Sequence, residues 1–294
     1  MRPFAYRAPT SVGEAVALLA DCDGHAHPLA GGTDLLVQLR HNQLEVDLVV
    51  DVKRIPELST ISLDSVKGLI VGAAVTCARL CEHPGLREVY PGLVDAVSII
   101  GGTAIQERAT VGGNLCNAAP SGDSIPPMIV LGATCTIAGP QGIRTVPAEA
   151  FCTAPGVSVL GKGEVLISIH FPAPTPSSGA SYVRFTPRRE MDLAVAGAGA
   201  WVALSADRSR IVDAHIALSA VAPTPLLVGA AGDALVDRAP TEEAFSQAAS
   251  LAQQAARPIS DVRGTEAQRR HLVGVLVQRA LRVAVSRAKG RNEG

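Results

Sequence analysis

The sequence predicts a globular protein of mixed helices and strands, divided into roughly two domains. Its 294 residues exceed the usual length of one domain, and 47% hydrophobic residues suffice for a sizeable core. Short apolar, β-rich runs alternate with helical patterns along most of the chain, as is typical of mixed folds. A proline- and serine-rich segment at 172–179 interrupts this alternation and is the best candidate for a linker.

The first helix has the clearest start signal. Ser11 and Glu14 are spaced as a capping box, in which polar side chains accept hydrogen bonds from early backbone N–H groups. Apolar residues then continue the helix up to a polar stop at 21–24. A short helix is predicted at 35–40 and a buried strand at 44–52, where Val and Leu dominate.

The rest of the chain continues this alternation. Before the linker, the patterns predict strands at 69–72 and 165–171 and the start of a helix at 76–81. They also predict glycine turns at 101–102 and 112–113. After the linker, they predict one strand and two helices, at 211–221, 241–256 and 264–289.

Composition and charge exclude several classes of partner. The formal net charge of −1 offers no global attraction to nucleic acid or to an anionic membrane surface. Five Phe, three Tyr and one Trp also leave few rings on which single-stranded bases could stack. The longest apolar run, Leu193 to Leu204, is shorter than the roughly 18 residues of a spanning helix. Because no hydrophobic leader is visible at the N-terminus, we expect a cytoplasmic protein without a membrane span.

The cysteines and histidines show no metal-site pattern. None of the six cysteines belongs to a C-x-x-C motif, and only Cys77 and Cys81 lie close in sequence. Iron–sulfur and zinc sites need clustered thiolates, so we expect reduced, mostly buried cysteines and no metal on this chain. His25 and His27 form a close pair that we interpret as a loop feature.

Three motif-like segments fail a closer inspection. Residues 156–163 resemble a P-loop, but Gly163 replaces the hydroxyl that binds Mg²⁺, and a strand follows where a helix should begin. Gly197-x-Gly199 lacks the third glycine of a dinucleotide fingerprint. Residues 121–124 contain no G-x-S-x-G elbow. We therefore expect a hairpin turn at 156–163, and neither a Rossmann site nor hydrolase chemistry.

Two glycine loops carry the chemistry. Residues 30–34 and 109–114 each contain a Gly-Gly pair flanked by a threonine and a short polar side chain. Paired glycines let the backbone approach a ligand closely and turn its N–H groups toward one point. Such loops suit a pyrophosphate, whose charge can be bound by amide donors without lysines. About 80 residues apart, they could converge from two subdomains on one extended ligand.

Here the sequence resembles the FAD-binding (medium) subunit of molybdenum hydroxylases, the family of xanthine dehydrogenase and carbon monoxide dehydrogenase. The match spans nearly the whole chain in family order. It consists of Pro28-Leu29-Ala30-Gly31-Gly32-Thr33-Asp34-Leu35, Thr110-Val111-Gly112-Gly113-Asn114-Leu115-x-x-Ala118-x-Pro120-x-x-Asp123, Tyr182-x-Arg184-Phe185-x-x-Arg188-Arg189-x-x-Asp192-Leu193-Ala194 and Ser260-Asp261-x-Arg263-Gly264-x-x-x-x-Arg269.

The resemblance implies the fold class and the domains. It predicts an α+β protein with a two-lobed FAD-binding domain of the vanillyl-alcohol-oxidase (PCMH) type at 1–174, its lobes at roughly 1–55 and 56–174. A smaller α+β domain, like the C-terminal domain of carbon monoxide dehydrogenase flavoproteins, would follow at 180–290.

The resemblance also implies the cofactor-binding residues. The FAD pyrophosphate would be held by Pro28, Leu29, Ala30, Gly31, Gly32, Thr33, Asp34 and Leu35. The ribityl and phosphate region would continue along Ile100, Thr110, Val111, Gly112, Gly113, Asn114 and Asp123. Leu166 would form an apolar wall near the adenine. Arg184 stands where some relatives place a lysine that contacts FAD, and Leu193 where a side chain lies beside the isoalloxazine. Asp34 and Asp123 could instead be helix N-caps.

The implied function is electron transfer within a larger enzyme. FAD on this chain would pass electrons from two [2Fe–2S] clusters on a small subunit to an external acceptor. A molybdenum cofactor on a large subunit would oxidise an N-heterocycle, purine or aldehyde, in a dimer of heterotrimers. No catalytic residue for that oxidation is needed on this chain.

Three alternatives stay open. The chain could be a carbon monoxide dehydrogenase flavoprotein, although Gly-Gly-Thr-Asp and Gly-Gly-Asn differ from the histidine- and aspartate-bearing loops typical of those proteins. It could be a stand-alone flavin-dependent oxidoreductase, but that needs an acid or base near the flavin, which Leu193 cannot provide. It could also be a scaffold that has lost FAD, but the intact glycine pairs at 31–32 and 112–113 argue against this alternative. Reduction of aromatic coenzyme A thioesters is disfavoured because the chain has no inserted cysteine cluster.

Overall fold

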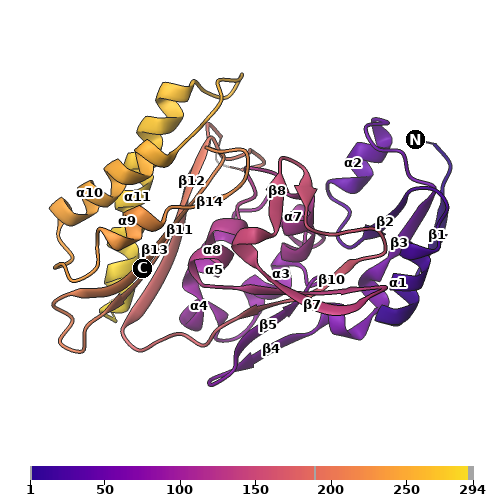
Figure 1. The fold of residues 1–294 in the computed structure, drawn as a ribbon, viewed down its shortest axis with the longest axis horizontal. Coiled ribbons are helices and arrows are strands. Elements are labelled where there is room, and N and C mark those ends of the chain that lie inside the picture. The colour runs from indigo at the N-terminus through magenta and orange to yellow at the C-terminus, as the bar shows by residue number, and fades with distance from the viewer. Residues whose placement is uncertain (1, 189, 291–294) are drawn as a thin grey trace.

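A small parallel sheet lies at one end of the molecule (Figure 1). The computed structural model describes residues 2–188 and 190–290. Its first sheet has the order β1-β3-β2, formed by β1 (Ala5–Arg7), β3 (Leu48–Asp51) and β2 (Ala26–Leu29), and two helices accompany it, α1 (Val12–Ala20) and α2 (Leu35–Arg40). The sheet and its helices form the first lobe.

The predicted helix start is confirmed, whereas the first strand is shorter than predicted. The Ser11 hydroxyl accepts a hydrogen bond from the Glu14 N–H at 3.3 Å, and Glu14 reaches back to the Thr10 N–H at 3.0 Å. The strand predicted at 44–52 spans only Leu48–Asp51, because Leu44 and Val46 pack in a small apolar cluster with α2 instead of pairing in the sheet.

The second lobe contains an antiparallel sheet of five strands in the order β4-β5-β10-β6-β7. These are β4 (Ile61–Asp64), β5 (Gly68–Gly72), β10 (Val165–Phe171), β6 (Thr134–Gly139) and β7 (Gly142–Pro147). A hairpin of β8 (Cys152–Ala154) and β9 (Val157–Ser158) and three 3₁₀ turns at 52–54, 56–59 and 148–150 complete the connections.

Six short helices belong to this lobe: α3 (Cys77–Glu82), α4 (Leu86–Val89), α5 (Pro91–Val97), α6 (Thr103–Gln106), α7 (Val111–Asn117) and α8 (Ile125–Val130). Apolar side chains of the helices and of the sheet share one buried cluster, for example Leu93 and Met128 with Val71 and Ile169. The predicted turn at Gly112–Gly113 is wrong, because Thr110 caps a helix and both glycines lie in its first turn.

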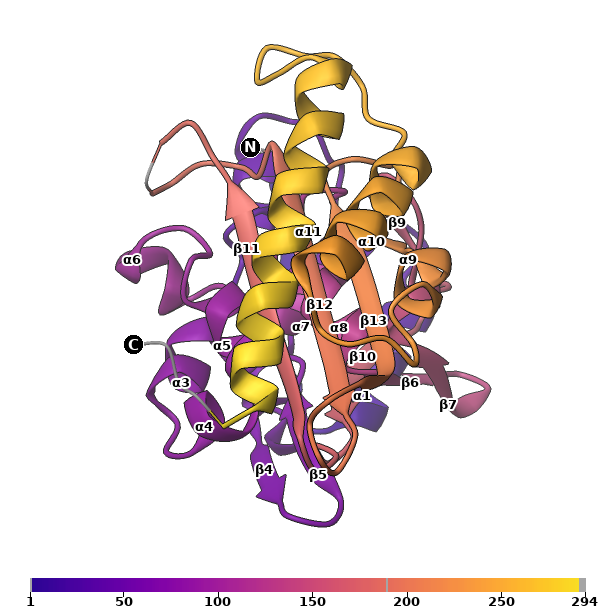
Figure 2. The ribbon, with the colours of Figure 1, turned by 90° about the vertical axis from the view of Figure 1, so that its left-hand side faces the viewer.

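The C-terminal part is a sheet covered by helices on one face (Figure 2). Its strand order is β11-β12-β13-β14, with β11 (Ser178–Phe185), β12 (Ala196–Leu204), β13 (Ile211–Ser219) and β14 (Leu226–Leu227). The helices are α9 (Gly229–Asp233), α10 (Glu242–Ala255) and α11 (Glu266–Ala288), and α11 runs across β11 and β12. This arrangement confirms the mixed class and the α+β C-terminal domain.

The alternation along β12 explains how this sheet is buried on both faces. Ala196, Ala198 and Ala200 belong to the core beneath α10 and α11. Gly199 belongs to the opposite face of the sheet, and a Cβ added there would lie only 3.2 Å from Pro126 of α8. Because side chains alternate between the two faces of a strand, small residues here let helices approach from both sides. The C-terminal sheet therefore packs closely on the helices of the second lobe.

Polar contacts fix this packing. Arg287 of α11 donates hydrogen bonds to both carboxylate oxygens of Asp95 in α5, at 2.6 and 2.9 Å. Asp95 also accepts a hydrogen bond from the Tyr182 N–H in β11 at 3.2 Å. One carboxylate thus joins α5, β11 and α11. Within the described ranges, no helix combines the length and the apolarity that crossing a bilayer requires.

Candidate cofactor site

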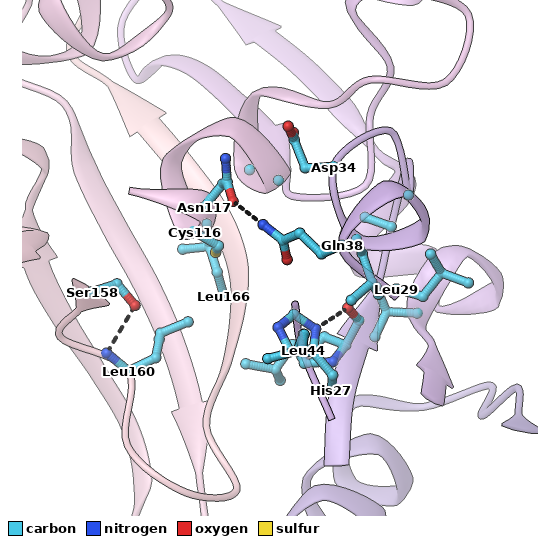
Figure 3. Close-up of a pocket in the computed structure, with 18 of the residues that line it drawn as sticks. His27, Leu29, Asp34, Gln38, Leu44, Cys116, Asn117, Ser158, Leu160 and Leu166 are labelled. Carbon is cyan, nitrogen blue, oxygen red and sulfur yellow. Dashed lines mark hydrogen bonds between the residues drawn. The ribbon is translucent and has the colours of Figure 1, made fainter. Parts of the chain in front are cut away.

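A cavity of about 860 Å³ lies between the two lobes of the N-terminal part (Figure 3). The first lobe contributes residues 24–35 and 43–46 with Gln38, and the second lobe contributes residues from the α7 region and from 156–166. A volume of this size lies in the range of cofactor sites, which is about 300–1,000 Å³. A hydrogen bond of 3.4 Å from Gln38 to Asn117 connects α2 and α7 across the cavity.

The first glycine loop requires both of its glycines. Gly32 has a φ of +77°, a left-handed conformation that side chains rarely adopt. Gly31 packs against the backbone of Arg108 and Ala109, and a Cβ there would overlap the Arg108 carbonyl oxygen. This contact holds the loop directly against the chain that leads into the second glycine loop, so the structure brings the two loops together.

The second glycine loop is the start of α7. The Thr110 hydroxyl caps the helix and accepts a hydrogen bond from the Gly113 N–H at 2.9 Å. A Cβ on Gly112 would lie 2.6 Å from the Cα of Ala73, so only glycine fits between α7 and that segment. The backbone of this helix turn consequently forms part of the cavity wall.

The two loops present unpaired amide donors. Among the described residues, no acceptor pairs with the N–H groups of residues 31–35, nor with those of Val111 and Gly112. Backbone N–H groups inside proteins almost always find a partner, so a row of free donors around a cavity indicates a bound acceptor. Among the described residues that line the cavity, Lys162 is the only lysine or arginine, and it belongs to the 156–163 segment and not to either glycine loop. The donor set fits the pyrophosphate of FAD.

Asp34 stands at the N-terminus of α2 without capping it. Its side chain accepts no hydrogen bond from the helix backbone, so the capping interpretation is not supported. The carboxyl lines the cavity, and desolvation by the cavity walls raises its pKa. A carboxyl that is more easily protonated opposes an anionic ligand less strongly.

Most of the residues expected at the site line this cavity. They are Pro28, Leu29, Ala30, Gly31, Gly32, Thr33, Asp34, Leu35, Ile100, Thr110, Gly112, Gly113, Asn114 and Leu166. Val111 does not, because its side chain is fully buried in the core of the second lobe. Its backbone N–H, at the start of α7, has no acceptor among the described residues.

Asp123 and Arg184 lie outside the lining and bind each other. Their side chains are only 9% and 7% exposed and form an ion pair. Asp123 also accepts a hydrogen bond from the Tyr182 hydroxyl at 2.7 Å. Burial raises the pKa of Asp123, while the Arg184 cation and the Tyr182 hydroxyl oppose that rise. The residue that begins α8 at its N-cap is Ser124, so Asp123 is not the helix cap.

This buried pair reaches the cavity through its neighbours. Arg184 donates a hydrogen bond of 2.8 Å to the carbonyl oxygen of Ile99, which precedes the lining residue Ile100. Ser124, which follows Asp123, donates a hydrogen bond of 2.8 Å to the side-chain oxygen of Asn114. The geometry thus supports an indirect role for Asp123 and Arg184, in which they position two walls of the site.

Leu193 lies away from the main cavity. Its side chain is 51% exposed and lines a second, smaller pocket beside the C-terminal domain. Among the described residues that line the cavity between the lobes, Leu193 is absent.

Sequence reasoning missed one wall of the cavity. The segment 156–163 contains the turn after β8, strand β9 and a loop into β10, and nearly all of it lines the cavity. The glycines of this segment predicted a turn, but they did not indicate that the turn faces the first lobe across the cavity. His27 and Cys116 were missed as well, and burial raises the pKa of the Cys116 thiol to about 12. The six cysteines are all free thiols.

Two family descriptions together match nearly the whole chain. The FAD-binding domain in molybdopterin dehydrogenase matches residues 2–174, and the CO dehydrogenase flavoprotein C-terminal domain matches residues 181–284. The chain belongs to this family of FAD-binding dehydrogenase subunits. It is therefore a flavoprotein subunit of the oxidoreductase class, with the two-lobed FAD-binding fold and C-terminal domain of that family.

Known relatives align from end to end. The xanthine dehydrogenase FAD-binding subunit of Escherichia coli O157:H7 is 34% identical over 98% of both chains. The carbon monoxide dehydrogenase medium chain of Hydrogenophaga pseudoflava is 33% identical over 97% of this chain and 98% of that one. A solved carbon monoxide dehydrogenase structure from the same organism superposes with a TM-score of 0.92, at 34% identity over 98% and 99% of the chains.

Proposed function

We propose that this chain is the FAD-binding electron-transfer subunit of a heterotrimeric molybdenum hydroxylase. The observation that carries the proposal is the row of free amide donors on two glycine loops, which meet at one cavity between two lobes. When bound there, FAD would take electrons from [2Fe–2S] clusters on a small subunit and deliver them to an external acceptor. The large subunit would carry the molybdenum cofactor and the substrate.

The binding residues follow from the geometry of the cavity. The amides of Gly31 to Leu35 and of Val111 and Gly112 would hold the pyrophosphate, and Thr110 and Asn114 would shape the second loop. Ile100 and Leu166 would supply apolar walls at the two sides. Asp123 and Arg184 would position these walls without touching the cofactor. Leu193 lines the smaller pocket and not this cavity, and its proposed place beside the isoalloxazine rests on the family resemblance alone.

The substrate of the assembly is proposed to be an N-heterocycle, a purine or an aldehyde. The relatives named for xanthine and for carbon monoxide are 34% and 33% identical, so similarity alone does not favour one of them. The loop residues Thr33 and Asn114 favour the heterocycle or aldehyde class over carbon monoxide. The assembly is proposed to be a dimer of heterotrimers, and the domains are proposed to divide between residues 174 and 180.

A reconstitution experiment tests the proposal. The chain is purified alone and together with the proposed large and small subunits, and flavin content and substrate oxidation are measured. We expect flavin absorption bands in the complex and substrate-dependent acceptor reduction only when all three subunits are present. Substrate oxidation by the chain alone would favour a stand-alone flavoenzyme. Absence of flavin from the active complex would favour a scaffold, and either result would overturn the proposal.

A further inference from the structure

One wall of the cofactor cavity has no regular secondary structure. Residues 159–164 connect β9 to β10 without forming a helix or a strand, and all of them except Val159 line the cavity. Across the cavity lie residues 24–27 and 43–46 of the first lobe. Because this loop has no helix or sheet ladder of its own, other contacts must give it a fixed position.

The Arg144 side chain of β7 makes these contacts. Its guanidinium donates hydrogen bonds from Nε and from Nη2 to the two carboxylate oxygens of Glu164, both at 2.7 Å. Nη2 also donates to the Val159 carbonyl oxygen at 2.9 Å, and the Glu164 carboxylate accepts a hydrogen bond from the Gly161 N–H at 2.7 Å. A fork of two charge-assisted hydrogen bonds is both strong and directional. Arg144 and Glu164 thus tie the start, the middle and the end of the loop to one strand.

The loop also rests on the first lobe. Gly163 has a φ of +80°, and a Cβ added there would lie 2.9 Å from both the Ala20 Cβ at the end of α1 and the Pro140 Cγ in the turn between β6 and β7. The φ and the close approach both require glycine at this position. The loop therefore reaches from the second lobe to the first and covers one end of the cavity.

The covered end suits the adenosine half of FAD, an assignment that rests on the proposed function. The isoalloxazine exchanges electrons with groups outside this chain, so it needs an end of the cavity that the loop does not cover. Adenine takes no part in electron transfer and can be enclosed. Leu44, Leu160 and Leu166 stand around this part of the cavity, and such apolar side chains suit the faces of a flat base (Figure 3).

We propose that Arg144 and Glu164 are positioning residues, which hold the 159–164 loop over the adenosine half of FAD and thereby make the chain prefer FAD to FMN. FMN shares the isoalloxazine, the ribityl chain and one phosphate with FAD but lacks the adenosine monophosphate half. A loop that is already in place need not be ordered when the ligand binds, so the affinity for FAD rises. Arg144 does not line the cavity and acts only through the loop.

The test is the affinity of the flavin-free full chain for FAD and for FMN, measured by fluorescence titration. Arg144→Gln is expected to weaken FAD binding by about tenfold or more and to leave FMN binding unchanged. Arg144→Lys keeps the charge but not the fork, so it should recover part of the FAD affinity. The Arg144 side chain is 40% exposed, and an ion pair with such an exposed partner contributes little to stability, so both variants should fold.

Arg282→Gln is the matched control. Arg282 of α11 forms the same forked pair with Glu242 of α10, its side chain is 47% exposed, and it lies outside the cavity lining. This variant should leave both affinities unchanged. Unchanged FAD affinity in Arg144→Gln, or equal weakening of FAD and FMN, would overturn this proposal and leave the proposed function standing. If the wild-type chain bound no FAD, the proposed function would fail, and this proposal with it.

Discussion

Replacing Arg184 by methionine is expected to destabilise the protein strongly. The substitution removes a buried ion pair with Asp123 and a hydrogen bond of 2.8 Å to the Ile99 carbonyl oxygen. Asp123 is left 9% exposed, with the Tyr182 hydroxyl as its remaining polar partner. Leaving one charge of a buried pair uncompensated costs about 3–5 kcal/mol. For a chain of this size that loss lowers the Tm by roughly 10 °C.

The assay is thermal and urea denaturation of the wild-type chain and three variants, with flavin fluorescence as a second readout. Arg188→Met is the matched control, because Arg188 pairs with Asp192 at the surface, where its side chain is 72% exposed. An exposed pair contributes about 1 kcal/mol at most. Asp123→Asn combined with Arg184→Met removes both charges and should recover a large part of the loss.

The pH dependence has a defined sign. Burial raises the pKa of Asp123, and loss of the Arg184 cation raises it further. A carboxyl with a raised pKa in the folded state stabilises the fold when protonated and loses that contribution as pH rises through the folded pKa. The destabilisation by Arg184→Met should therefore shrink as pH falls from neutrality through the raised pKa of Asp123, and the double variant should not show this change. A loss below about 1 kcal/mol at pH 7, or no dependence on pH, would refute the reasoning.

Three further results are expected. Gly31→Ala should weaken FAD binding by about tenfold or more, because its Cβ would overlap the Arg108 carbonyl oxygen. The control is Gly13→Ala in α1, whose Cβ would meet nothing within 4 Å; it should leave FAD binding unchanged and stabilise the chain by about 0.5–1 kcal/mol. Equal effects of the two variants on FAD affinity in a fluorescence titration would contradict this prediction. Hydrogen bonds from Arg144 lower the pKa of Glu164, so Glu164→Gln should reduce stability in urea by less than about 1 kcal/mol near neutral pH, and the difference should vanish as pH falls through the lowered pKa. Burial raises the pKa of Cys77 and Cys135 to about 12, so neither thiol should react with a disulfide reagent at pH 8 until the chain is unfolded; alkylation of both in the native state would show that this core opens.

The local elements were largely predictable because their signals are local. Ser11, Thr76 and Thr241 each precede an apolar helical pattern, and each caps a helix in the structure. The strand at 165–171 was recognised from its β-branched and aromatic residues and is confirmed. Gly112 and Gly113 misled the prediction, since paired glycines usually mark turns and here permit close packing of a helix end against Ala73.

The site was only partly predictable because its walls come from distant segments. The two glycine loops were found from their composition, and they do line one cavity. The wall at 156–163 could not be found that way, because only the three-dimensional pairing of the lobes places it opposite residues 24–46. The pairing of Asp123 with Arg184 across 61 residues was equally invisible in the sequence, which carries no record of which buried charges meet.

The central claim is that backbone amides of two glycine loops hold the pyrophosphate of FAD. The most direct test compares the affinity of the flavin-free chain for FAD and for riboflavin, which shares the isoalloxazine but has no phosphate, by fluorescence titration. We expect stoichiometric binding of FAD and binding of riboflavin that is weaker by about a hundredfold or more, since charge-assisted hydrogen bonds contribute about 1.5–3 kcal/mol each. Equal affinities for the two flavins, or no binding of FAD, would contradict the account.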